Sequence, residues 1–203
     1  MKPKMILTTP VTRPLNIPLM AANEELVRAP EHFDIEWWIL PDTFALKVPP
    51  EEEVVAPPLP WARVRNIHIP REGQFWGELV YNEIWDEVPP DAWHMGIGDD
   101  SLPVPGIFAA LREEIDRGAD VVMFPMDIGT HTCPARPEKI FPGNVSGGQV
   151  FFRREVSGDL RWKREAGATL DGQFLKDLLD RTLESRKWVF RDAPLIRHNQ
   201  LPR

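Results

Sequence analysis

The sequence predicts an α+β fold: a mixed or mostly antiparallel sheet with two or three helices packed on it and many proline-rich loops. Candidate strands outnumber candidate helices, and the two kinds of element do not alternate regularly along the chain, as they would in a purely parallel α/β fold. Proline accounts for 22 of the 203 residues, about twice its ordinary share of roughly 5%. Long regular elements should therefore be few.

The length of the chain bounds its domain organisation. A chain of 203 residues buries a core without disulfides or metals, and we expect a single domain over 1–203. The alternative is a small N-terminal lobe, 1–48, joined to the body through the loop 49–60. The sequence of that loop, PPEEEVVAPPLP, suits neither a helix nor a sheet.

The first quarter of the chain predicts mostly extended structure. The first 20 residues carry four prolines, so we interpret them as an extended arm lying on the body. Residues 21–29 predict a short helix with Asn23 as its N-cap. Residues 35–40 (IEWWIL) have the alternation of a strand, and 44–48 is expected to pair back against it.

The next segments predict a hairpin. Residues 62–69 and 75–85 favour two antiparallel strands joined by a turn at 70–73. The second strand would carry large apolar side chains on both faces, which indicates a central position in the sheet. Residues 91–103 (DAWHMGIGDDSLP) are expected to be irregular.

The stretch 104–128 is the clearest helix-then-strand unit in the sequence. Apolar residues recur at helical spacing from Ile107 to Ile115, with charged residues on the opposite face. Gly118 supplies a stop signal. The continuous apolar run 121–124 is typical of a strand buried on both faces.

The remaining elements follow a loop at 129–148. Residues 149–156 and 159–165 predict a hairpin turning at Ser157 and Gly158. A last helix is expected over 172–186, capped by Asp171. Residues 188–190 predict a final short strand.

Charge is unevenly distributed. Residues 21–127 contain 22 acidic and 7 basic side chains, whereas 128–203 contain 9 acidic and 14 basic ones. An acidic front favours a basic partner and disfavours nucleic acid and membranes. The single cysteine, Cys133, excludes an intrachain disulfide and favours a reducing compartment. No stretch reaches the roughly 20 apolar residues of a membrane span, and we expect a soluble cytoplasmic protein.

Common catalytic motifs are absent from the sequence, but three weaker constellations stand out. His131 and Cys133 could place a thiolate beside an imidazole. His94 precedes Asp99 and Asp100, and an imidazole oriented by a carboxylate is a common acid/base pair. The loop 141–148 is rich in glycine, which suits an anion bound by backbone N–H groups. Each has an ordinary structural interpretation that we favour: a buried cysteine, turn residues and a connecting loop.

The order of elements from the central unit onward resembles the immunity proteins of bacterial polymorphic-toxin systems, in the group called Imm11-like. The matching stretches are 104–128, 150–153 with Trp162, and 172–190, about half of the chain. The resemblance implies a small cytoplasmic α+β protein that neutralises a cognate toxin without catalysis of its own. It transfers no binding residue to this sequence, and the N-terminal half departs from the pattern.

We therefore predict a non-enzymatic binding protein, an immunity protein or inhibitor, whose partner is a toxin with a basic face. No catalytic residue, cofactor or metal is expected. Eight tryptophans, six of them between 37 and 93, mostly fill the core, but some are expected to anchor the partner. The predicted binding residues are Glu51, Glu52, Glu53, Trp61, Trp93, Asp99 and Asp100. One alternative is an enzyme with its site around His131, Cys133 and His94; another is a structural component of a phage or secretion system.

Overall fold

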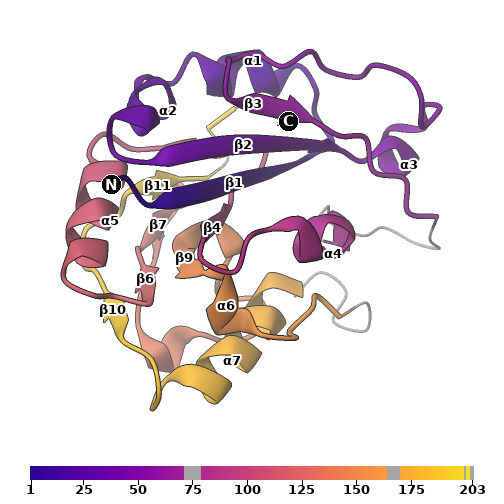
Figure 1. Ribbon diagram of the computed structural model, residues 1–203. Coiled ribbons are helices and arrows are strands. Elements are labelled where there is room, and N and C mark those ends of the chain that lie inside the picture. Colours follow the sequence, from indigo (N-terminus) through magenta and orange to yellow (C-terminus); the bar gives the residue numbers. More distant parts are fainter. Residues whose placement is uncertain (71–78, 164–169, 199, 202–203) are drawn as a thin grey trace.

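The computed structural model describes residues 1–70, 79–163, 170–198 and 200–201, and its main element is a seven-stranded sheet (Figure 1). The strands lie in the order β10-β6-β9-β4-β1-β2-β3. Their bounds are β1 (Lys4–Val11), β2 (Asp34–Pro41), β3 (Ala62–Val64), β4 (Trp93–Gly96), β6 (Val121–Met123), β9 (Val150–Arg153) and β10 (Trp188–Phe190).

Most strands of this sheet run parallel to their neighbours. β1 pairs in parallel with both β2 and β4, β2 with β3, and β6 with β10. Only β9 is antiparallel to its two neighbours, β4 and β6. The predicted α+β class with a mixed sheet is thus confirmed, although parallel pairing dominates it.

A second, four-stranded sheet has the order β5-β11-β7-β8. It contains β5 (Leu102–Pro103), β7 (Met126–Asp127), β8 (Thr132–Cys133) and β11 (Ile196–Arg197). β11 lies parallel to β7 and antiparallel to β5. This small sheet therefore brings the end of the chain next to the segment that follows β4.

Seven α-helices occur in the described part of the chain, more than the two or three expected. Only α5 and α7 exceed six residues. The bounds are α1 (Asn16–Ala21), α2 (Glu24–Arg28), α3 (Thr43–Leu46), α4 (Val80–Ile84), α5 (Ile107–Asp116), α6 (Arg154–Ser157) and α7 (Leu170–Thr182), with 3₁₀ turns η1 (Ala29–Glu31), η3 (Trp85–Glu87), η4 (Pro137–Lys139) and η5 (Gly147–Gln149). None of the described helices is long and apolar enough to cross a membrane.

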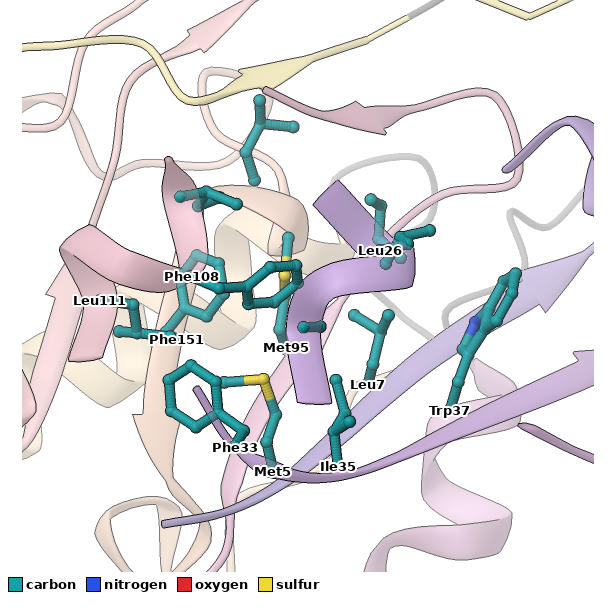
Figure 2. Close-up of a cluster of buried hydrophobic side chains, with 14 of the residues drawn as sticks. Met5, Leu7, Leu26, Phe33, Ile35, Trp37, Met95, Phe108, Leu111 and Phe151 are labelled. Carbon is teal, nitrogen blue, oxygen red and sulfur yellow. The ribbon is translucent and has the colours of Figure 1, made fainter. Parts of the chain in front are cut away.

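The large sheet is covered on both faces, since successive side chains of a strand point to opposite sides. Met5 and Leu7 of β1 join one core cluster, which α1, α2 and α5 cover, whereas Ile6 joins the other, which α4 and α7 cover. Figure 1 shows α1 and α2 on one side of β1 and β2, with α4 and α7 on the other. Figure 2 shows the first cluster, in which Phe108 and Leu111 of α5 face the strands.

The prediction of a surface arm over the first 20 residues is wrong, because β1 is a central strand of the sheet. Its residues Met5, Ile6 and Leu7 are fully buried. Proline tolerates this position because β4 pairs only with Met5–Thr8. Pro10 lies beyond that ladder, where its missing N–H costs no hydrogen bond to β4.

Three further expectations are corrected. Residues 44–48 do not form a strand, since α3 begins at Thr43 behind the side chain of Asp42, which accepts a hydrogen bond from the amide of Ala45. The expected strand 75–85 is helical from Val80 to Ile84; its residues 75–78 lie outside the described ranges. The helix wins because its buried side chains follow helical spacing; they are Val80, Tyr81 and Ile84.

The predicted hairpin at 149–165 does not form. β9 pairs with β4 and β6, both distant in sequence, and the chain then enters α6. Central strands find their partners by tertiary packing, so local turn signals at Ser157 and Gly158 were misleading. The part of the second predicted strand at 164–165 lies outside the described residues.

Other predicted elements are confirmed. α2 begins behind Asn23, whose side chain accepts a hydrogen bond from the amide of Leu26 at 3.1 Å. The unit 104–128 forms α5 and the buried strand β6, and 188–190 forms β10. The last helix exists as α7, but Asp171 lies in its first turn rather than at the N-cap. The division at 49–60 stays a prediction.

Candidate functional site

The site lies at a point where the chain reverses its direction of growth across the sheet. From β1 the chain proceeds outward through β2 to β3, and it then returns to the other side of β1 as β4. The connections that leave β1 and β4 at their carboxyl ends therefore diverge. In open α/β sheets, ligands bind in the crevice that such a switch point creates.

Polar residues from both connections meet at this switch point. Thr12 and Arg13 follow β1, and Asp99 follows β4. One oxygen of Asp99, Oδ2, accepts hydrogen bonds from the amides of Thr12 and Arg13, both at 2.7 Å, and from the Thr12 hydroxyl at 3.2 Å. The other oxygen, Oδ1, accepts a hydrogen bond from Nη1 of Arg13. Asp99 thus holds the loop after β1 in place.

Asp100 has a different environment. Its Oδ2 lies 3.2 Å from Nη1 of Arg13, and its Oδ1 lies 3.3 Å from Nδ1 of His198. The Ser101 hydroxyl also donates to Oδ1, at 3.2 Å. Burial opposes ionisation of Asp100, but His198, Arg13 and Ser101 outweigh it and hold the pKa of the carboxyl below its usual value.

His198 reaches this position through the small sheet. It directly follows β11, and its amide donates to the carbonyl of Asp127, the last residue of β7, at 2.8 Å. Its Nδ1 lies 2.9 Å from the Ser101 hydroxyl. The amide of Gln200 donates to the carbonyl of Asp100 at 3.0 Å. The end of the described chain therefore closes one side of the site.

Asp100 and His198 could supply part of the ligand set of a divalent cation. No group of three or more acidic, histidine or cysteine residues that could hold a metal occurs among the described residues. Asp100 and His198 supply two donor atoms 3.3 Å apart, close to the roughly 3 Å between adjacent ligands of an octahedral ion with bonds of about 2.1 Å. A Mg²⁺-like ion is commonly held by one or two carboxylates plus substrate phosphates and water. The pair fits such an ion if a ligand completes its shell.

A third carboxylate, Asp171, borders the opposite side of the end of β4. Its Oδ2 accepts a hydrogen bond from the amide of Gly147 at 2.7 Å, and its Oδ1 accepts one from Nε1 of Trp162 at 3.1 Å. A Cβ on the next residue, Gly148, would lie 3.4 Å from the carbonyl oxygen of Gly96. The turn η5 thus connects Asp171 to the last residue of β4.

Asp171 lines a small hollow whose walls are mostly aromatic. The lining residues are Tyr81, His94, Gly96, Gly147, Phe152, Trp162, Phe174 and Leu175. Removal from water raises the pKa of the Asp171 carboxyl, and the hydrogen bonds that it accepts only partly oppose this rise. Asp171 therefore holds a proton at higher pH than Asp100 does.

His94 belongs to the core beneath this hollow, and the structure does not bring it to Asp99 or Asp100 as an acid/base pair. Its Nε2 lies 2.9 Å from the Thr8 hydroxyl, and its ring packs edge-on against Tyr81 and Trp85. Within the described part of the chain, its Nδ1 has no hydrogen-bond partner. Burial, aided by the charge of Arg154, lowers the pKa of His94 to about 3. The imidazole is therefore neutral at physiological pH.

His131 and Cys133 lie together but away from His94. The sulfur of Cys133 is 3.9 Å from Nε2 of His131, and Cys133 packs against the core cluster on the face of the sheet opposite to His94. Burial raises the pKa of the Cys133 thiol, which is the opposite of what a nucleophilic cysteine needs. The three residues of the predicted alternative site therefore do not converge.

The predicted binding residues occupy three different environments. Glu51, Glu52 and Glu53 are exposed on the loop before β3. Trp61 is half-buried against the core, whereas Trp93 on β4 is only 3% exposed. Asp99 and Asp100 alone among the predicted residues lie at the switch point. That these seven residues bind a basic protein partner stays a prediction.

Sequence reasoning missed Arg13, His198 and Asp171 as members of the site. A signal existed only for the placement of Asp99 and Asp100: the run WHMGI before them is apolar enough for a buried strand, and carboxylates after such a strand face a sheet edge. The loop 141–148 binds a carboxylate within the chain, because the amide of Gly147 donates to Asp171. Nothing local marked His198.

No family model matches this chain, and no curated protein matches it. Its solved structural neighbours include TarS 1–349 from S. aureus (TM-score 0.61, 14% identity), covering 96% of this chain and 60% of that one. A mannosyltransferase, PcManGT from Pyrobaculum calidifontis, in complex with GDP-Man and Mn²⁺ aligns with TM-score 0.57 and 12% identity, over 100% of this chain and 59% of that one.

A putative glucose-1-phosphate thymidylyltransferase from Bacillus anthracis aligns with TM-score 0.51 and 11% identity, over 95% of this chain and 87% of that one. The chain thus spans about 60% of the first two neighbours. The resemblance to toxin immunity proteins is wrong, and so is the non-enzymatic function that it implied, because none of these neighbours is named as an immunity protein and two of them are named as transferases. At such low identity they show one thing: this chain has the fold of TarS and of the mannosyltransferase.

Proposed function

We propose that this chain is a glycosyltransferase domain that transfers a sugar from a nucleoside diphosphate donor to an acceptor hydroxyl. The observation that carries the proposal is the meeting of Arg13, Asp99, Asp100 and His198 at the switch point between β1 and β4. Two structures with the same fold support it: TarS in complex with UDP-GlcNAc (TM-score 0.54) and the mannosyltransferase with GDP-Man and Mn²⁺.

The donor diphosphate is proposed to bind beside Asp100. A divalent cation on Asp100 and His198 would neutralise the charge that develops on the leaving phosphate. Arg13, whose side chain is 30% exposed, can donate to phosphate oxygens from the same place. Asp99 keeps the loop after β1 in the conformation that presents Arg13.

The acceptor hydroxyl is proposed to lose its proton to Asp171. A carboxylate with a raised pKa is a better base than an ordinary one, because its strength approaches what proton transfer near neutral pH needs. Two carboxylates whose environments push their pKa values apart commonly divide such roles. Asp100 would remain ionised with the cation, while Asp171 would take up the proton.

The acceptor is not identified by these residues, and the chain spans only about 60% of TarS 1–349 and of the mannosyltransferase. Acceptor recognition is proposed to involve the hollow beside Asp171. We also propose a cytoplasmic location, on the single cysteine of the chain.

The test is binding of UDP-GlcNAc and GDP-mannose in the presence of Mn²⁺, measured by calorimetry. We expect one of the two donors to bind, and Asp100→Asn to weaken that binding about 10- to 100-fold, as loss of a cation-holding group does. Glu52→Gln on the exposed loop is the matched control and should bind like the wild type.

Absence of binding by both donors, or equal binding by the Asp100→Asn variant, would count against the proposal. Assays with a nucleoside triphosphate and a sugar phosphate provide a further check. Release of pyrophosphate in those assays would instead indicate a nucleotidyltransferase, in keeping with the third structural neighbour.

A further inference from the structure

Arg13 holds the two carboxylates of the site in different ways. Both oxygens of Asp99 accept a hydrogen bond from Arg13: Oδ2 from its backbone amide and Oδ1 from its Nη1. With Asp100 only one contact is made, between Nη1 and Oδ2 at 3.2 Å. The first interaction anchors Arg13, and the second is the weaker one.

This arrangement places a fixed positive charge where a divalent cation would bind. Asp100 is 5% exposed, so water screens the repulsion between Arg13 and a bound cation only poorly. A cation on Asp100 must therefore displace Nη1 or accept its repulsion. Either outcome weakens cation binding to the free protein.

A nucleoside diphosphate changes that balance. Its phosphate oxygens offer Arg13 a new partner of opposite charge, and a guanidinium binds phosphate well because it presents several N–H donors in one plane. Among the described residues, only Nη1 of the Arg13 guanidinium is hydrogen-bonded or ion-paired. Nε and Nη2 therefore remain as donors for the diphosphate while Nη1 stays on Asp99.

We propose that Arg13 makes cation binding at Asp100 conditional on the nucleoside diphosphate. In the free protein the guanidinium charge opposes a cation at Asp100, and in the loaded protein phosphate oxygens on Nε and Nη2 neutralise that charge. This inference rests on the proposed function. Because coupling between two ligands is reciprocal, the cation strengthens nucleotide binding by the same factor as the nucleotide strengthens cation binding.

The experiment is a titration with Mn²⁺ followed by electron paramagnetic resonance, with and without UDP or GDP, corrected for Mn²⁺ bound by the free nucleotide. For the wild type we expect weak Mn²⁺ binding that tightens at least about tenfold with the preferred nucleotide. For Arg13→Gln we expect Mn²⁺ to bind the nucleotide-free protein about tenfold more tightly than it binds the wild type. Adding the nucleotide should then tighten Mn²⁺ binding to Arg13→Gln much less than it does for the wild type.

Two variants make the result specific. Arg13→Lys keeps the positive charge and should keep weak Mn²⁺ binding in the free protein. Asp100→Asn should abolish Mn²⁺ binding in the wild-type and Arg13→Gln backgrounds alike. Circular dichroism and thermal melts show whether each variant has remained folded. If Arg13→Gln unfolds, Arg13→Lys still reports on the charge, because only loss of the positive charge is expected to tighten Mn²⁺ binding.

The outcomes separate this inference from the proposed function. If Mn²⁺ binds the wild type with nucleotide but Arg13→Gln does not bind it more tightly without nucleotide, the inference about Arg13 is overturned and the donor site stands. If Mn²⁺ binding survives Asp100→Asn, the cation lies elsewhere and both fail. If neither the wild type nor Arg13→Gln binds Mn²⁺ under any condition, both fail as well.

Discussion

Two carboxylates flank the end of β4, and their surroundings are opposite in character. Asp100 faces the guanidinium of Arg13 and the imidazole of His198, and its pKa lies below the usual value. Among the described residues, Asp171 accepts hydrogen bonds from neutral groups, including the amide of Gly147 and the indole of Trp162, and its pKa is raised by burial. One end of a strand thus separates a carboxyl group of lowered pKa from one of raised pKa.

The difference shows how one sheet edge can divide two tasks. Arg13 and His198 reach Asp100 because the loop after β1 and the end of β11 converge on it. Asp171 is instead enclosed by the aromatic residues of α4, α7 and β9, which supply no charge. The neutral and the charged environment are therefore consequences of which elements cover each side of β4.

The largest effect on turnover is expected when Asp171 is replaced. We expect Asp171→Asn to lower turnover about 10²- to 10⁴-fold, the range for loss of a general base, while donor binding changes little. Asp100→Asn should show the reverse pattern, with donor binding lost first. Steady-state kinetics with the identified donor, together with calorimetric binding, separates the two effects.

Asp177→Asn is the control on the same helix, because Asp177 pairs with Lys163 at the surface and does not line the hollow. If Asp171→Asn retained full turnover, or if it lost donor binding as Asp100→Asn does, the two carboxylates would not differ in role.

The neutral character of the Asp171 side can be tested at His94. The pKa of His94 is about 3 in the folded protein and about 6.5 in the unfolded chain. Below pH 6.5 the unfolded state therefore binds a proton that the folded state does not, and the free energy of unfolding decreases as the pH is lowered. The loss should be on the order of 3 kcal/mol by pH 4. In His94→Phe this slope should flatten, because the titrating group is gone.

Urea denaturation between pH 4 and 7.5 measures the slope. Thr8 loses a hydrogen bond in His94→Phe but still donates to the carbonyl of Met95 at 3.3 Å, so stability at neutral pH should change by less than about 1.5 kcal/mol. An unchanged slope in His94→Phe would show that His94 does not titrate on unfolding as described.

The smallest effect is expected at Cys133. Its thiol lies near His131 but not beside either carboxylate, and burial raises its pKa. Cys133→Ser should therefore leave transfer activity unchanged and alter stability by no more than about 1 kcal/mol. Loss of activity in a folded Cys133→Ser protein would move the active site away from the end of β4.

Part of the fold could be predicted from the sequence because it is specified locally. The unit of α5 and β6 shows the helical spacing of Ile107, Phe108 and Leu111 and then a short apolar run, and both patterns depend only on neighbouring residues. The cap at Asn23 is equally local. By contrast, β1 and β4 lie among prolines and glycines, and their central place depends on partners far along the chain.

The candidate site was predicted in part for the same reason. Asp99 and Asp100 stand out in the sequence, although as surface binding residues rather than as members of a buried cluster. Arg13 lies 86 residues from Asp99, and His198 lies further along the chain than either aspartate. No spacing rule links such positions, because only the pairing of β1 with β4 and of β11 with β7 brings them together.

The sequence by itself determined the apolar faces of α5 and β6, the cap at Asn23 and which side chains carry charge. Tertiary structure decided the strand order, and with it the switch point at which Arg13, Asp99, Asp100 and His198 meet. It also decided which carboxylate lies beside Arg13 and His198 and which is enclosed by aromatic rings. The physical reason is that strand pairing and pKa values both depend on neighbours in space, whereas helical periodicity and capping depend on neighbours in the chain.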